Sequence, residues 1–181
     1  MIKKTLIGIA VILWLCVLLG ALWWYNSTYI RTEFFAGQQL QFPAQVTSDK
    51  PIRFIHFWSP DCPCNIGNQQ HLAELMETYA EQVSFYQMQM PGSQGQLPKN
   101  LTSIQPIELE LPPESLPASP AVAIFDEFDR LAYFGPYSEG AICTSSNSFV
   151  EPILESLLEG RSVLASSNLA SGCFCAWQAQ P

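Results

Sequence analysis

Basic residues are scarce in this chain. Its 181 residues include 8 Lys and Arg against 16 Asp and Glu, with only 2 His. Lys3 and Lys4 are two of the eight bases and no acid precedes them, so the remainder has 6 bases against 16 acids, a net charge of −10. A surface with this excess of negative charge repels phosphate groups. The composition therefore argues against a nucleic-acid or anionic-lipid partner.

Charge is absent altogether from Thr5 to Trp24, twenty mostly apolar residues. A helix needs about 20 such residues to cross a bilayer. Both early lysines precede this segment and the next base is Arg31, which places the N-terminus in the cytoplasm by the positive-inside rule. The sequence predicts a cytoplasmic stub (1–4) and a transmembrane anchor (5–25). The rest would lie outside the cytoplasm, as the periplasmic domain of a single-pass protein of the bacterial inner membrane.

The apolar segment also lacks a good cleavage site. Signal peptides have a shorter apolar run, about 7–15 residues, and end in a small-x-small motif, which Leu19-Gly20-Ala21 matches poorly. Leu13-Trp14-Leu15, before Cys16, lacks the small residues of a lipoprotein signal. We therefore expect an uncleaved signal anchor.

Five cysteines follow the anchor, and outside the cytoplasm they can form disulfides. They are Cys62, Cys64, Cys143, Cys173 and Cys175. Because five is odd, at least one must be free, bound to a metal or paired with another molecule.

The remaining sequence predicts one domain (50–160) between a polar tether (26–49) and a cysteine-containing tail (161–181). Apolar and aromatic patterns predict two strands joined by a helix, then a proline-rich connection with at most a short helix near 99–103, and finally a hairpin and a helix. The predicted segments are strand 53–58, helix 63–79, strand 83–88, hairpin strands 121–125 and 131–135, and helix 148–159.

The order of these elements, and three short motifs, resemble the thioredoxin-like superfamily. Phe57-Trp58 is followed by a cysteine at the start of a helix, Ser119-Pro120-Ala121 precedes a strand, and Gly135 ends the hairpin. The resemblance implies an α/β fold, with a central mixed sheet and flanking helices. It also implies that Cys62 is the attacking cysteine, and that Pro120 is cis and helps to hold a substrate peptide in extended form.

The cysteine motif itself departs from the family pattern. Position 65, where a thioredoxin has its resolving cysteine, is Asn65, and the second cysteine comes one residue earlier at Cys64. A Cys62–Cys64 disulfide would close a tight ring, and strain makes a disulfide more oxidising, which suits oxidase or isomerase chemistry. Asp61 opposes thiolate formation by like-charge repulsion.

The two histidines lead to different expectations. His56 takes the position where thioredoxins carry a buried acid, so it could relay protons near neutral pH; the alternative is a buried strand histidine with one hydrogen bond and no role. His71 is predicted to be a solvated surface residue.

A second C-x-C motif, Cys173-Phe174-Cys175, lies in the tail. If the tail folds back toward Cys62, the two pairs could exchange electrons within one molecule, with Cys143 as a further partner. The alternative is a structural disulfide that fixes the tail, for example between Cys143 and Cys173 or Cys175.

The sequence therefore predicts a membrane-anchored thiol–disulfide exchange protein, a candidate oxidoreductase acting on exported proteins. Cys62 would attack, Cys64 or the tail pair would resolve, and no cofactor would be required. One alternative is a Cu(I) or Zn(II) metallochaperone, because thiolates select these metals; the ligands would be Cys62, Cys64, Cys173 and Cys175. The other is a non-catalytic binding module with a static disulfide.

Overall fold

The structure is a computed structural model. It describes residues 2–36, 40–43, 46, 48–109, 116–140, 143–165 and 168–177. Parts of the predicted tether, proline-rich connection and tail lie outside these residues.

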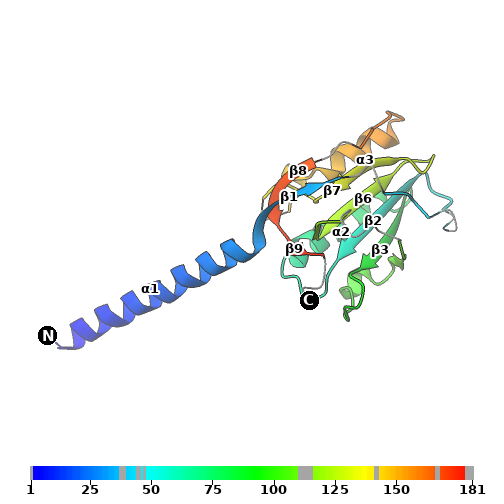
Figure 1. Ribbon diagram of the computed structural model, residues 1–181. Helices are drawn as coiled ribbons and strands as arrows, with labels where there is room; N and C mark the ends of the chain where they lie inside the picture. Colours follow the sequence, from blue (N-terminus) through cyan, green and yellow to red (C-terminus); the bar gives the residue numbers. More distant parts are fainter. Residues whose placement is uncertain are drawn as a thin grey trace.

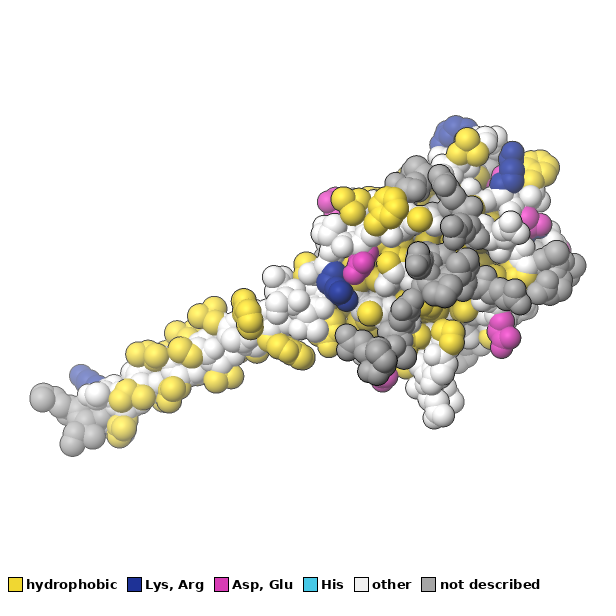
Figure 2. All heavy atoms as spheres, in the orientation of Figure 1, with side chains coloured by type: hydrophobic (Ala, Val, Ile, Leu, Met, Phe, Trp, Pro, Cys, Tyr) yellow, Lys and Arg dark blue, Asp and Glu magenta, His cyan; other side chains and the backbone are white. Residues whose placement is uncertain are grey.

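The N-terminal helix α1 (Ile2–Tyr29) extends away from the rest of the chain (Figure 1). The most apolar 18-residue stretch of its segment Lys3–Tyr29 has a mean hydropathy of 2.7, and none of that stretch is buried. Apolar side chains are distributed along the length of the projecting helix (Figure 2). By length and composition, α1 could therefore cross a membrane.

The body of the protein is a mixed α/β structure around a five-stranded sheet, with strand order β4-β3-β2-β6-β7. The central strand β2 pairs in parallel with β3 and antiparallel with β6, as expected of a βαβ unit followed by a hairpin. All seven residues of β2 are buried, and apart from Arg53 and His56 they are apolar or aromatic, as expected of a strand covered on both faces. The strands are β2 (Ile52–Trp58), β3 (Val83–Gln89), β4 (Gln105–Pro106), β6 (Ala121–Phe125) and β7 (Leu131–Gly135).

Two helices, α2 (Asn65–Tyr79) and α3 (Val150–Leu158), pack on one face of the sheet. Leu72 and Leu75 of α2 share a core with Leu154 of α3 and with alternate residues of β2 and β6. The short helix expected in the connection is the 3-10 turn η2 (Lys99–Leu101), and a second such turn, η3 (Ser145–Asn147), precedes α3.

His71 shows that the expectation of a solvated histidine in α2 is wrong. Its side chain is only 1% exposed. His71 Nε2 lies 3.1 Å from the Ser148 hydroxyl, which also accepts hydrogen bonds from the N–H groups of Val150 and Glu151 at the start of α3. Ser148 thus caps α3 and links it to α2.

The opposite face of the sheet is covered by segments that flank the predicted domain. Phe35 from the N-terminal side, and Phe174 and Trp177 from the tail, pack with Ile55 and Phe57 of β2. Phe174 is 2% exposed and Trp177 7%, so the tail is part of the core.

Short strands attach these flanking segments to each other and to the body. β1 (Ile30–Phe35) begins directly after α1 and pairs antiparallel with β8 (Asn168–Cys173) of the tail. β9 (Cys175–Ala176) pairs antiparallel with β5 (Ala118–Ser119). Both terminal segments therefore meet at the end of the molecule from which α1 projects (Figure 1).

Candidate functional site

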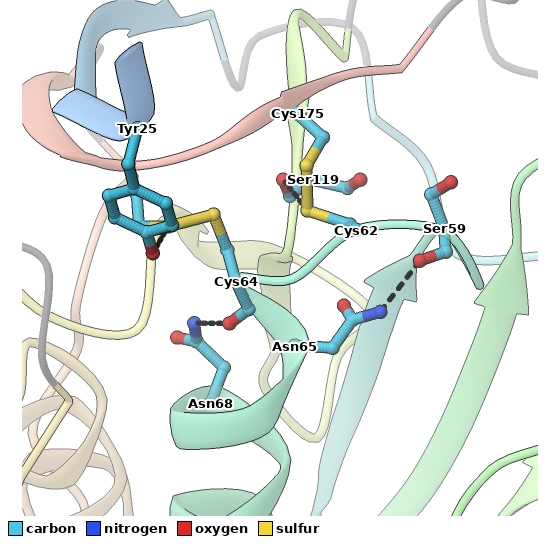
Figure 3. Close-up of a disulfide and its surroundings, with 9 residues drawn as sticks. Tyr25, Ser59, Cys62, Cys64, Asn65, Asn68, Ser119 and Cys175 are labelled. Carbon is cyan, nitrogen blue, oxygen red and sulfur yellow. Dashed lines mark hydrogen bonds between the residues drawn. A yellow bond between two sulfur atoms is a disulfide. The ribbon is translucent and has the colours of Figure 1, made fainter. Parts of the chain in front are cut away.

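The first C-x-C motif lies in the tight connection between β2 and α2. The N–H of Cys62 donates to the carbonyl of Ser59, and the N–H of Asn65 donates to the carbonyl of Cys62. The Asn65 side chain also donates to the Ser59 carbonyl, at 2.6 Å (Figure 3). The Asn65 amide therefore fixes the turn that presents both cysteines.

The second C-x-C motif is covalently joined to the first by two disulfides. Cys62 bonds to Cys175 and Cys64 bonds to Cys173, across 113 and 109 residues of sequence (Figure 3). Cys62, Cys64 and Cys173 are at most 6% exposed, whereas Cys175 is partly exposed. The fold therefore brings four of the five predicted cysteines together.

This connectivity corrects two expectations from the sequence. The structure contains no Cys62–Cys64 disulfide, so the argument from strain in a C-x-C ring does not apply to it. The structural disulfide expected between Cys143 and the tail is also wrong, because Cys143 is a free thiol. Burial raises the pKa of Cys143 to about 11, which makes it a poor nucleophile at neutral pH.

Three of the four sulfur atoms form a compact group. The Sγ atoms of Cys62, Cys64 and Cys175 all lie within 4.8 Å of one another. Reduction of either disulfide would thus leave a thiol next to the remaining one, the arrangement that disulfide exchange requires.

The peptide bond between Ser119 and Pro120 is cis, and this loop lies against the first disulfide. Cys62 Sγ is 3.7 Å from the carbonyl oxygen of Ser119. In the β5–β9 pair, Ser119 is opposite Cys175. The loop therefore lies next to both cysteines of the Cys62–Cys175 disulfide.

His56 lies in β2 and is completely buried. Its Nδ1 is 2.8 Å from the hydroxyl of Tyr137, and its Nε2 has no hydrogen-bond partner among the described residues. Burial lowers the pKa of His56 to about 3, so the ring is neutral at physiological pH.

The end of α1 also contributes to the site, which the sequence did not predict. The Tyr25 hydroxyl lies 3.4 Å from Cys173 Sγ (Figure 3). Tyr29 and Ile30 also pack against the cysteine cluster. A tyrosine at the end of an apolar helix usually indicates a membrane interface. The sequence around Tyr25 therefore did not point to a contact with a cysteine.

Residues 31–177 match the family described as a domain of unknown function, DUF6436. The chain belongs to this family. No curated protein matches it.

Two crystal structures of bacterial proteins share the overall fold. An uncharacterized conserved protein from Geobacillus kaustophilus has 21% sequence identity and a TM-score of 0.52, over 73% of this chain and 79% of the other. A hypothetical protein from Sinorhizobium meliloti 1021 has 15% identity and a TM-score of 0.51, over 73% and 82% of the two chains. At these identities the similarity concerns the fold alone.

Proposed function

We propose that this protein is a membrane-anchored thiol–disulfide exchange protein with a thioredoxin-like fold, acting on the cysteines of exported proteins. One observation carries the proposal: two C-x-C motifs, more than 100 residues apart, are joined by two adjacent disulfides. A single disulfide would be enough to fix the tail, because the tail is already held by β8, β9 and its buried aromatic side chains.

The thioredoxin-like assignment is supported by the order of the elements and by the place of the cysteines. A βαβ unit is followed by an antiparallel hairpin and a helix, Cys62 lies three residues before the start of α2, and the cis Ser119–Pro120 bond precedes β6. The helix that thioredoxins place on the second sheet face has no counterpart among the described residues, where Phe35, Phe174 and Trp177 cover that face.

The exchange reaction needs a substrate with two thiols. One substrate thiolate attacks a disulfide of the protein, such as Cys62–Cys175, and forms a mixed disulfide while the other cysteine leaves as a thiolate and takes up a proton. The second substrate thiolate then attacks the mixed disulfide. The substrate gains a disulfide, the protein gains two thiols, and two electrons have moved to the protein.

Within this scheme the predicted residues have separate roles. Cys62 is the cysteine that forms the mixed disulfide with substrate, and Pro120 shapes the loop beside it. In the reverse reaction the reduced Cys62 attacks a substrate disulfide, and Cys64 or the tail pair then resolves the mixed disulfide and releases the reduced substrate. For His56 we propose a fixed hydrogen bond to Tyr137, because a ring whose burial lowers its pKa to about 3 is a weak proton acceptor.

The anchored topology follows from α1. The segment is long and apolar enough to span a membrane, and its lysines precede the apolar run. By the positive-inside rule the cysteines would then lie on the non-cytoplasmic side, where oxidising conditions maintain disulfides.

The test uses the oxidised full-length chain in detergent and a reduced synthetic peptide with two cysteines. We expect each chain to oxidise two peptide molecules, because two disulfides accept four electrons. A Cys62→Ala/Cys175→Ala double variant should oxidise one. The matched control, Cys143→Ala, should still oxidise two, because Cys143 is not bonded.

The proposal fails if the peptide stays reduced while both disulfides remain intact. That result would instead identify the disulfides as static links in a binding module.

A second candidate function, binding of Cu(I) or Zn(II), is favoured by the sulfur group itself. A tetrahedral zinc with Zn–S bonds of about 2.3 Å separates its sulfurs by about 3.8 Å. Three sulfurs within 4.8 Å of one another, with Cys173 beside them, need only small movements to reach that geometry after reduction. We expect the reduced chain to bind one metal ion that survives competition with a chelator. Cys175→Ala should weaken the binding, and immediate loss of metal to the chelator would exclude this function.

A further inference from the structure

The cysteine site is built onto the last turns of the apolar helix α1. Tyr25 lies one turn before the end of α1, and its hydroxyl is directed at Cys173 (Figure 3). The Tyr25 ring also packs on the ring of Tyr29, with centroids 5.2 Å apart. Tyr25 therefore connects the membrane-type helix to the second disulfide through direct contact.

The backbone makes the same connection. The carbonyl of Tyr29 accepts a hydrogen bond of 2.8 Å from the N–H of Phe174, between the two tail cysteines. β1 starts at the next residue, Ile30, which is paired with Cys173. No linker separates α1 from the site, so the position of the helix fixes the position of the disulfides.

Helix geometry gives the depth of the site. The uncharged segment Thr5–Trp24 has twenty residues, and at 1.5 Å per residue it spans about 30 Å, the thickness of the hydrocarbon core. Tyr25 then falls at the far boundary of that core, where tyrosine is enriched. Since Tyr25 contacts Cys173, the Cys64–Cys173 disulfide lies at the level of the lipid headgroups.

We propose that the exchange partner of this site is a membrane-embedded protein that presents two thiols at the level of the headgroups. This inference rests on the proposed function and adds the class of partner. The acidic remainder of the chain has no charge attraction to an anionic surface, so α1 alone holds the site there. A partner fixed in the same plane meets the disulfide without leaving the membrane, which raises its effective concentration.

The electron transfer is the one already described, with the partner as the dithiol. One partner thiolate attacks Cys62–Cys175, which lies beside Cys64–Cys173 because the Sγ atoms of Cys62, Cys64 and Cys175 are within 4.8 Å of one another. Cys175 leaves as a thiolate and takes up a proton, and the second partner thiolate then displaces Cys62 from the mixed disulfide. The partner is oxidised by two electrons and the protein is reduced by two.

The experiment measures whether the site reaches headgroup-level reagents. The reduced full-length chain, with Cys16→Ala and Cys143→Ala in every sample, is placed in phosphatidylcholine vesicles. Two probes are compared: phosphatidylethanolamine with a pyridyl disulfide on its headgroup, and soluble dipyridyl disulfide. A protein thiolate that attacks either probe forms a mixed disulfide and releases pyridinethione, which absorbance follows.

The test variant carries twelve Gly and Ser residues after Asn26, which separate α1 from the site. A flexible tether of that length has a root-mean-square span of about 20 Å. We expect the rate with the lipid probe, relative to the soluble probe, to fall about tenfold. The same insertion between Ser162 and Val163, in the loop after α3, should leave the ratio unchanged.

Equal ratios in the parent and the Asn26 variant would overturn the inference, since the site would then not depend on α1 for its position. The dithiol-peptide assay on the oxidised form of each sample separates this result from failure of the proposed function. That assay tests exchange in solution, and the insertion should not alter it.

Discussion

Removing one disulfide should cost far less stability than removing both, because the two links close almost the same loop. The Cys62–Cys175 and Cys64–Cys173 bonds span 113 and 109 residues. Closing a loop of that size lowers the entropy of the unfolded chain by the equivalent of about 4.8 kcal/mol at 25 °C. Once one bond exists, the other closes only the six residues 62–64 and 173–175, worth about 2 kcal/mol.

The expected losses follow from this nesting. Replacing either bonded pair by alanine should lower the free energy of unfolding by about 2 kcal/mol, and replacing all four cysteines should lower it by about 7 kcal/mol. The losses in the two pair variants, added together, should therefore be about 3 kcal/mol smaller than the loss in the fourfold variant.

Urea unfolding of the full-length chain in detergent, followed by circular dichroism, measures these values. The wild-type chain in excess reductant is a control, because it should match the fourfold variant. Additive losses, or a single-pair variant as unstable as the fourfold variant, would refute the reasoning.

Three further predictions concern buried polar groups and the free thiol. Tyr137→Phe should lower the free energy of unfolding by about 1–3 kcal/mol, measured by urea unfolding, because His56 Nδ1 loses its buried partner. The free energy of unfolding should also fall as the pH drops below about 6.5, by up to about 1.4 kcal/mol per pH unit. The reason is that His56 in the unfolded chain binds a proton there, whereas the folded ring, with a pKa of about 3, does not. Urea unfolding of the His56→Gln variant should lack this contribution. Cys143 should react with iodoacetamide at pH 8 at least about 100-fold more slowly than an exposed cysteine, as mass spectrometry can show, because burial raises its pKa to about 11.

Local sequence patterns predicted the elements of the sheet well. The strand at 53–58, the helix that follows it and the hairpin at 121–135 depend on apolar runs and turn residues near in sequence, and the structure confirms them. The cis bond at Ser119–Pro120 was expected only through the resemblance to thioredoxins, and it is present.

The pairing of the terminal segments could not be predicted from such patterns. β1 and β8 are short, partly exposed and more than 130 residues apart, so neither segment has a strong periodic signal of its own. The disulfide connectivity could not be predicted for the same reason, because it depends on where the pairing of β1 with β8 places the tail. His71 was misjudged because its partner, Ser148, lies 77 residues away.

The contact between β1 and β8 also has a consequence for synthesis. Cys62 and Cys64 leave the ribosome more than 100 residues before Cys173 and Cys175. At about 5–20 residues per second, the early cysteines wait roughly 5–20 s for their partners. A chain that ends before β8 therefore lacks both the strand that pairs with the end of the anchor and the two sulfurs that complete the site.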